Sequence, residues 1–417
     1  MKTITSMHNP RFSMPGLAVT ALFAVLAPTL STANSAPHPG DPFPGLSAEQ
    51  QALFDGGEEY FVQELTVTEG LGPVYSEKSC LACHALGGIG GGDSLENANH
   101  FVQRFGTLNA NGSYNNLAVF GGDVLQTRSI SDDPGANGCK VAAEVIPPEA
   151  SILALRNPLP MFGIGLIAAI PDATILAGAR TAPDADGVLG RPNQAPTAAR
   201  PGRFGWKAQT VDLAAFNAAA ANGTMGFTSL LSPSEQKPQG LDTPAGCTNA
   251  ELGVVPFDDF IPEITAWEVM LAPVKQKSFD EEARRGQRVF NDIGCAKCHT
   301  PVMQSGSNFQ VKRTDGTLLA VEAVSDKPVR LYSDLLLHDM GADMDEKVTM
   351  GTAKGSEFRT APLWGLRLRT AFLHDGSASS VYDAIKDHGG ESAIIRDRYL
   401  KLLPRDKKAI AKFLDKI

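Results

Sequence analysis

Apolar residues recur at helical spacing in only a few stretches of this chain, and Gly- and Pro-rich segments separate them. Asp280 is placed as an N-cap before a helix whose first turn carries Glu281 and Glu282. Helices are also predicted over about 47–65, 160–170, 172–179, 210–221, 261–270 and 403–417. The pattern therefore favours a mainly α fold with long irregular connections.

The composition strengthens this expectation. The 417 residues include 41 Gly and 28 Pro, which leave little room for an extended sheet. By its length the chain has room for two or three domains. Residues 106–140 are rich in Asn, Gly, Ser and Asp and are expected to be loop. They open a loop-rich insertion over about 106–262.

Residues 1–35 have the pattern of a secretory signal peptide. Lys2 and Arg11 precede an apolar run over 17–27 that is too short to span a bilayer. An uncleaved N-terminal anchor is the alternative. No later stretch of the sequence is long and apolar enough to cross a membrane. The mature chain is therefore expected in the periplasm, without a transmembrane anchor.

The charge of the chain narrows the range of partners. The formal net charge is −9, and it becomes −11 if Lys2 and Arg11 leave with the signal peptide. An acidic protein has no electrostatic basis for binding nucleic acid. A basic partner such as a small cytochrome would be steered toward it. The alternative is that the charge serves only solubility.

Four of the six cysteines lie in two C-x-x-C-H motifs. In this motif two thiols bond to the vinyl groups of one haem, and the following His is placed to bind the iron. Zinc would need more Cys or His at close spacing than either motif has nearby. We therefore predict two covalently bound haem c groups, one on Cys80, Cys83 and His84 and one on Cys295, Cys298 and His299.

Two cysteines remain, Cys139 and Cys247. They are expected to form a disulfide, because export brings the chain into an oxidising compartment. Two buried free thiols are the alternative. A weak internal duplication is also expected, since a helix with a Gly and an aromatic residue precedes each haem motif.

The second axial ligand of each iron separates electron transfer from substrate chemistry. A six-coordinate haem moves electrons, and an open site can bind peroxide or oxygen. His388, at the end of a predicted helix, and His100, shortly after the first motif, are the first candidates. His338 and His374 are weaker candidates, because a hydrogen-bonded structural role is the commoner case for such residues. Met340 is the methionine ranked beside them.

Several segments resemble the di-haem oxidoreductase family of peroxidase-like proteins. They are FGIGLIAAIPDA over 162–173, GRFGWKAQ over 202–209, YSDLLLHDMG over 332–341, EFRTAPLWGLRLRTAFLHDGSASS over 357–380 and AIKDHGGE over 384–391. With both haem motifs they occur in the family's order from about residue 45 to the end. The family lies within the wider group of bacterial di-haem cytochrome c peroxidases and MauG-like enzymes. The resemblance implies two cytochrome c-like domains and two haems that divide the work.

The resemblance also implies roles for single residues. In the wider group the C-terminal haem takes its distal ligand 14 residues after a His that corresponds to His374, which gives His388. The peroxidases carry a displaceable His 16 residues after the proximal His of the first haem, which gives His100. A Trp lies between their haems, and Trp206 is the best match. For Trp206 a core position is the alternative.

The sequence departs from the peroxidases at the reactive haem. Their Gln and Glu correspond here to positions near Phe216 or Asn217 and to Thr224, so no acid stands there. Cleavage of the O–O bond needs a proton donor within hydrogen-bond reach. Arg156 is similar in its setting to a residue beside the active haem and would contact a propionate or the pocket, with a surface loop as the alternative. The calcium site of the peroxidases has no clear ligand set here, so calcium is possible but unsupported.

We therefore predict two cytochrome c-like domains, the first over 36–272 with the insertion and the second over 273–417. The expected activity is that of a peroxidase-like oxidoreductase, in which the C-terminal haem feeds a reactive N-terminal haem gated by His100. A small cytochrome or cupredoxin is the expected electron partner. The alternatives are a di-haem electron carrier and a MauG-like oxidase of a protein or organic substrate.

Overall fold

The two helices that precede the haem motifs begin where the sequence supplies a cap. Ser47 accepts a hydrogen bond from the backbone N–H of Gln50 at the start of α1 (Ala48–Val62). Asp280 does the same for Ala283 in α6 (Glu281–Ile293). Both caps satisfy a donor that the first turn would leave unpaired. The computed structural model describes residues 37–122, 124–194, 200–252 and 259–417.

The remaining elements are short and follow the described chain in order. The other helices are α2 (Ile164–Ala168), α3 (Asp172–Leu176), α4 (Leu213–Met225), α5 (Phe260–Met270), α7 (Val381–Lys386), α8 (Ala393–Lys401) and α9 (Pro404–Leu414). The strands are β1 (Val74–Tyr75), β2 (Val102–Leu108), β3 (Tyr114–Asn115), β4 (Arg128–Ser129), β5 (Ile152–Arg156), β6 (Met303–Gln304), β7 (Gln310–Lys312), β8 (Leu318–Ala320), β9 (Pro328–Val329), β10 (Leu337–Asp339) and β11 (Glu357–Arg359).

The prediction of a mainly α fold is corrected by these strands. The described residues are 32% helical and 14% extended, which makes the fold mixed. The largest sheet has the order β3-β2-β5, and β2 pairs antiparallel with β5 from Val102 opposite Arg156 to Gly106 opposite Ile152. Part of β2 lies in the segment that was expected to be loop. Pairing partners so far apart in sequence satisfy the backbone without leaving a local pattern.

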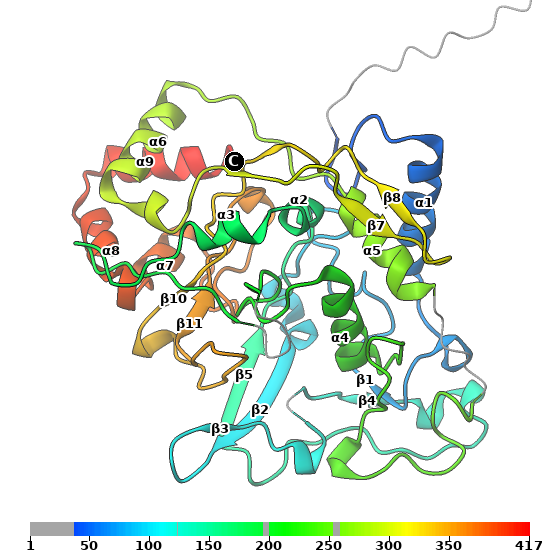
Figure 1. Cartoon of the computed structure of the whole chain (residues 1–417). Helices are drawn as coiled ribbons and strands as arrows, with labels where there is room; N and C mark the ends of the chain where they lie inside the picture. The colour runs from blue at the N-terminus through cyan, green and yellow to red at the C-terminus, as the bar shows by residue number, and fades with distance from the viewer. Residues whose placement is uncertain (1–36, 123, 195–199, 253–258) are drawn as a thin grey trace, which may run out of the picture. The chain divides into compact units, whose positions relative to one another are not determined.

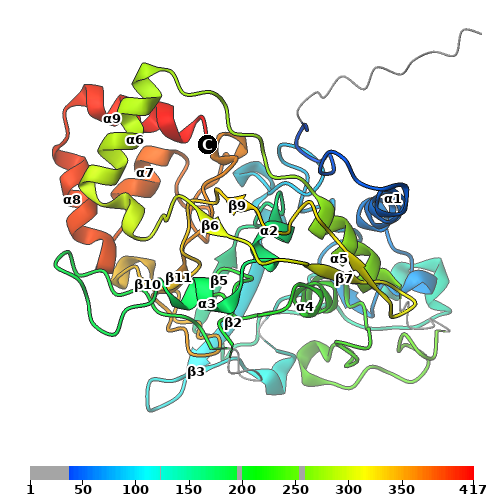
Figure 2. The ribbon, with the colours of Figure 1, turned by 45° about the horizontal axis from the view of Figure 1, so that its top comes forward.

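Each haem motif follows a helix that packs closely on a second helix. α1 packs on α5, and α6 packs on α9, which lies beside it in both Figure 1 and Figure 2. A Cβ atom at Gly57 would lie 2.3 Å from the carbonyl oxygen of Glu263, and one at Gly286 would lie 1.9 Å from that of Ala409. Only Gly permits these two close approaches, so the helix pairs share the packing device that a duplication predicts.

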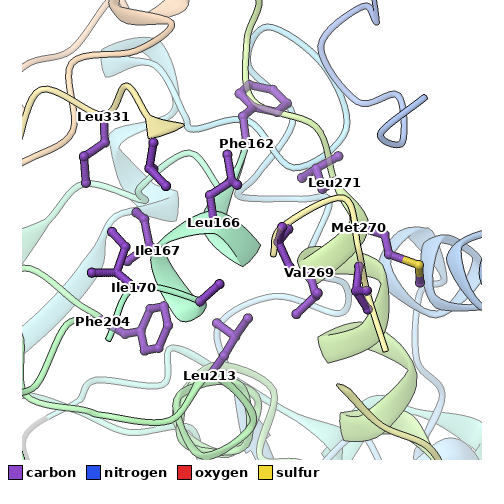
Figure 3. Packing of buried hydrophobic residues seen from close by; sticks show 14 of the residues in the cluster. Phe162, Leu166, Ile167, Ile170, Phe204, Leu213, Val269, Met270, Leu271 and Leu331 are labelled. Carbon is purple, nitrogen blue, oxygen red and sulfur yellow. The ribbon is translucent and has the colours of Figure 1, made fainter. Parts of the chain in front are cut away.

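The largest hydrophobic core joins both halves of the chain. Phe162 and Leu166 pack against Val269 at the end of α5, with Leu213 and Leu331 nearby (Figure 3). Residues from Ala36 to the C-terminus accordingly form one compact unit. The predicted division into 36–272 and 273–417 remains a prediction.

The predicted disulfide between Cys139 and Cys247 is confirmed. Both cysteines are buried and join segments 108 residues apart, so the bond closes most of the predicted insertion into one loop. The predicted signal peptide lies outside the described residues. In the part of the chain that the structure describes, no helix has the length and apolar character needed to cross a membrane.

Candidate functional site

The second motif lies at the end of α6 beside an apolar cavity. Gly294 ends the helix in left-handed backbone, and a tight turn over Cys295–Lys297 brings Cys295, Cys298 and His299 to the cavity wall. The His299 Nδ1 atom lies 3.0 Å from the carbonyl oxygen of Tyr332, which fixes the Nε2 atom as the free nitrogen. Burial, followed by the charge of His388, lowers the pKa of His299 to about 4. The imidazole is therefore neutral, as a metal ligand must be.

His388 faces His299 across this cavity. It follows α7, and its Nδ1 atom lies 2.6 Å from the carbonyl oxygen of Ala384. Burial lowers the pKa of His388 too. The two ring centroids are 6.5 Å apart. A metal–nitrogen bond of about 2.0 Å on each side, plus about 1.1 Å from each nitrogen to its ring centre, gives about 6.2 Å. The spacing suits one iron between the two rings.

The cavity wall fits a haem in its chemistry as well. The apolar part is formed by Phe290, Leu363, Leu366, Ile385, Ile395, Tyr399, Ile410 and Leu414. Arg359 and Arg369 also line the cavity, and neither has an ion-pair partner among the described residues. Burial lowers the pKa of each guanidinium to about 10. The charge of Asp334 favours the charged form of Arg359 without forming an ion pair with it. Two buried cations outside any ion pair are costly unless an anion accompanies them, and the two propionates of a haem would supply it.

The first motif repeats the local geometry of the second. The His84 Nδ1 atom lies 3.0 Å from the carbonyl oxygen of Gly91, and Phe61 lies 6.3 Å from His84 between ring centroids. The corresponding distance from Phe290 to His299 is also 6.3 Å. The Gly run after the first motif permits this turn, since a Cβ at Gly91 would lie 2.0 Å from the carbonyl oxygen of Leu86. Both proximal histidines are thus oriented in the same way.

His100 lies at the edge of the first motif. Its Nδ1 atom is 2.8 Å from a carboxylate oxygen of Asp93, which leaves Nε2 as the nitrogen able to bind a metal. That Nε2 atom lies 3.6 Å from a carboxylate oxygen of Glu77. The carbonyl of His100 accepts a weak hydrogen bond from the Cys83 thiol at 3.6 Å. A second carboxylate therefore lies near the nitrogen of His100 that Asp93 leaves free.

Trp206 lines the same cavity as the second motif. Leu86 and Asp93, from the segment after the first motif, line this cavity too. The Trp206 Nε1–H donates to the carbonyl oxygen of Asn157 at 2.8 Å. Its ring lies 6.5 Å from that of His374, edge to face. Trp206 thus shares a cavity with segments of both motifs, and its position between two haems stays a prediction.

Arg156 does not line this cavity. Its Nε–H donates to Glu346 at 2.8 Å, and Lys207 Nζ lies 3.2 Å from the same carboxylate. The guanidinium is buried, so the alternative of a surface loop is excluded. A protein carboxylate takes the place that the sequence argument gave to a propionate. Arg359, Arg369 and Arg396 line the cavity instead, and sequence reasoning missed them.

His338 and His374 have surroundings different from those of His299 and His388. The His338 ring is held at both nitrogens, by Glu391 at 2.8 Å and by Asp334 at 2.9 Å. His374 stacks on Phe358 with ring centroids 4.1 Å apart. Both line the cavity, and the hydrogen-bonded role judged commoner from the sequence is the one His338 has.

Glu268 is an acid near the first motif that sequence reasoning missed. It lies on α5, is 1% exposed and accepts a hydrogen bond from the Asn217 Nδ2 atom at 2.7 Å. Burial raises its pKa to about 8. After burial, the charge of Glu268 is the next cause that raises the pKa of the Cys80 thiol. The sequence does contain a signal for this buried acid. Glu268 comes one turn after Ile264, on the apolar face of the helix that was predicted there.

This carboxyl should make folding stability depend on pH. The folded state keeps Glu268 protonated up to about pH 8, but the unfolded chain ionises near 4.5. Stability therefore falls as pH rises through this window, by at most about 5 kcal/mol. Glu268→Gln should flatten the dependence and raise the melting temperature at pH 8, followed by circular dichroism.

A second buried carboxyl provides the comparison for that test. Burial raises the pKa of Glu144 to about 7, so Glu144→Gln should flatten the curve only below about pH 7. If E268Q and the unchanged chain lose stability equally between pH 7 and pH 8, Glu268 is not the protonated group.

Among the described residues, no group of three or more His, Cys, Asp or Glu side chains is arranged to hold a metal ion.

Two imidazoles facing each other across an apolar cavity, beside two thiols and two buried guanidiniums, define a haem-binding redox protein as the class of this chain. A family model described as "Di-haem oxidoreductase, putative peroxidase" matches residues 138–417. The chain belongs to this family of haem-dependent oxidoreductases, whose members carry two haems. The second motif and His388 lie within the match. The first motif precedes it, although the resemblance seen in the sequence starts near residue 45.

Three solved structures show a weaker similarity. Hydrazine synthase of Kuenenia stuttgartiensis is 13% identical with a TM-score of 0.40, over 97% of this chain and 100% of that one. A MauG-like protein associated with microbial copper homeostasis is 13% identical with a TM-score of 0.40, over 94% and 95%. A variant of the diheme peroxidase BthA from Burkholderia thailandensis is 13% identical with a TM-score of 0.39, over 92% and 88%. Scores of this size do not establish a shared fold. The comparison with curated proteins finds no match.

Proposed function

We propose that this chain is a periplasmic di-haem peroxidase with two unequal haem c sites built on cytochrome c-like domains. Cys295 and Cys298 would attach the electron-transfer haem, with His299 and His388 as its axial ligands. Cys80, Cys83 and His84 would hold the reactive haem. The observation that carries the proposal is the facing pair of His299 and His388 rings, 6.5 Å apart, because it closes both sides of the second iron.

Bound haem would supply one-electron transfer at the closed site and reduction of an O–O bond at the open one. Reduction of one hydrogen peroxide to two waters takes two electrons and two protons. A small cytochrome or cupredoxin would deliver the electrons, for which the acidic chain suits a basic partner. Trp206 lies in the cavity wall between the motif segments and is the side chain placed to shorten the path.

The protein groups around the first site would manage protons and access. Glu268 is protonated at neutral pH and buried near Cys80, so it can supply the acid that the sequence appeared to lack. Asn217 holds its carboxyl in one orientation. His100 would gate the iron, bound through Nε2 in one state and held by Glu77 and Asp93 in the other.

The test is addition of cyanide or peroxide to the haem-loaded protein in its oxidised, half-reduced and fully reduced states. We expect the Soret band of one haem, and not of both, to shift in the half-reduced state. Peroxide should then be consumed with a reduced cytochrome as the only donor. If no redox state responds, the chain is an electron carrier. If peroxide is consumed only with an added protein or organic substrate, the MauG-like alternative holds.

A further inference from the structure

One carboxylate anchors the loop that carries His388. Glu391 follows three residues after His388, and its Oε2 atom accepts hydrogen bonds from the backbone N–H groups of Leu189 at 2.8 Å and Gly190 at 3.1 Å. Its Oε1 atom accepts one from the N–H of Asp339 at 3.1 Å. Glu391 therefore ties the His388 loop to β10 and to a segment of the predicted insertion.

His338 extends this anchor to a second carboxylate. Its ring is 3% exposed, with Nδ1 2.8 Å from Glu391 and Nε2 2.9 Å from Asp334. Burial opposes a charge on the ring, but the hydrogen bonds with Asp334, Cys298 and Glu391 raise the pKa of His338 well above 6.5. The ring therefore lies between two carboxylates, with one of them in contact with each ring nitrogen.

Asp334, at the other end of this series of contacts, is hydrogen-bonded to the segment that carries His299. The backbone N–H of Asp334 donates to the carbonyl oxygen of Cys298 at 2.9 Å, and Cys298 directly precedes His299. Asp334 also accepts from the N–H of Leu336 at 3.0 Å, which fixes its carboxylate. A continuous series of contacts from half-buried Glu391 through buried His338 to buried Asp334 therefore joins the segments that carry His388 and His299.

We propose that Glu391, His338 and Asp334 are positioning residues that fix the separation of His299 and His388 and keep the second iron closed to external ligands. The inference rests on the proposed function, in which these two histidines bind one iron. Because Leu189 and Gly190 belong to the predicted insertion, this segment also contributes to ligation of the second haem.

Glu391→Gln tests this assignment with little change of volume. The amide would place an NH₂ group among N–H donors from Leu189, Gly190 and His338, so the contacts that hold the loop are weakened. Loss of a group that orients a metal ligand typically costs about 10- to 100-fold in metal affinity or activity. We expect the affinity of the second haem for carbon monoxide to rise by about the same factor.

The measurement is the number of carbon monoxide molecules bound by the reduced, haem-loaded chain. The unchanged protein should bind at most one, and E391Q should bind a second. Glu357→Gln is the matched control, since Glu357 accepts from Arg191 Nε at 2.7 Å and joins the same insertion segment without touching residues 388–391. E357Q should behave as the unchanged protein does.

Haem content and a second variant keep the outcome decisive. His338→Gln breaks the same series at its centre and should also allow a second carbon monoxide molecule to bind. This variant replaces E391Q as the test if E391Q does not retain two haems. If both variants hold two haems and bind carbon monoxide as the unchanged chain does, the positioning role is overturned and the ligation stands. If the unchanged chain already binds two equally well, the proposed ligation by His388 fails with it.

Discussion

Replacement of His388 by Ala should convert the second haem from a low-spin to a high-spin species and leave the first unchanged. The reason is the 6.5 Å spacing of the His299 and His388 rings, which would leave one imidazole on each side of a bound iron. Removal of one imidazole leaves an open coordination position in an apolar cavity. Electron paramagnetic resonance should show the low-spin signal of one haem per chain lost.

The matched variant for this prediction is His374→Ala. His374 also lines the cavity and is buried, but it stacks on Phe358 and does not face His299. H374A should keep the low-spin signal of the second haem. A spectrum of H388A identical to that of the unchanged protein would remove His388 from the coordination sphere. A loss in both variants would indicate general damage to the cavity.

Joint replacement of Cys295 and Cys298 by Ala should reduce the haem content from two per chain to one and unfold much of the second half. The cavity wall is apolar and contains Arg359 and Arg369 without ion-pair partners among the described residues. Without haem these surfaces would face water or an empty space. A domain is stable by only about 5–15 kcal/mol, so a loss on this scale is expected to abolish its cooperative melting.

The equivalent change at the first motif separates the two sites. Joint replacement of Cys80 and Cys83 should also leave one haem, but the low-spin signal assigned to His299 and His388 should persist. Haem staining after denaturing electrophoresis counts the covalent groups, and circular dichroism follows the melting. Two covalent haems in the C295A/C298A chain would contradict attachment at this motif.

Features fixed by short spacing were predictable from the sequence. Each C-x-x-C-H motif holds its groups within five residues, and the disulfide of Cys139 and Cys247 followed from their being the two cysteines left over. The resemblance pointed to His388 through its spacing from His374, which spans the short helix α7. Most helix positions were also predicted, although α8 was missed and α2 is shorter than expected since Gly163 starts it in left-handed backbone.

Features that depend on distant partners were not predictable. β2 pairs with β5 across about fifty residues, so the expected loop became a strand. Arg359 reads in sequence as an ordinary strand residue, and only the fold shows that it lines a cavity outside any ion pair among the described residues. Glu268 becomes an acid with a raised pKa only because α4 and α5 bury it together. Strand pairing, the position of Arg359 in the cavity wall and the raised pKa of Glu268 all depend on residues distant in the sequence. The local pattern of residues therefore does not predict them.

The central claim is that the two iron sites are unequal, with the second closed by two histidines. A crystal structure of the oxidised, haem-loaded chain tests it most directly. The account predicts His299 and His388 Nε2 atoms about 2 Å from one iron, and at the other iron His84 with either an open face or His100 opposite. A second iron with an open face, or with a ligand other than His388, would contradict it.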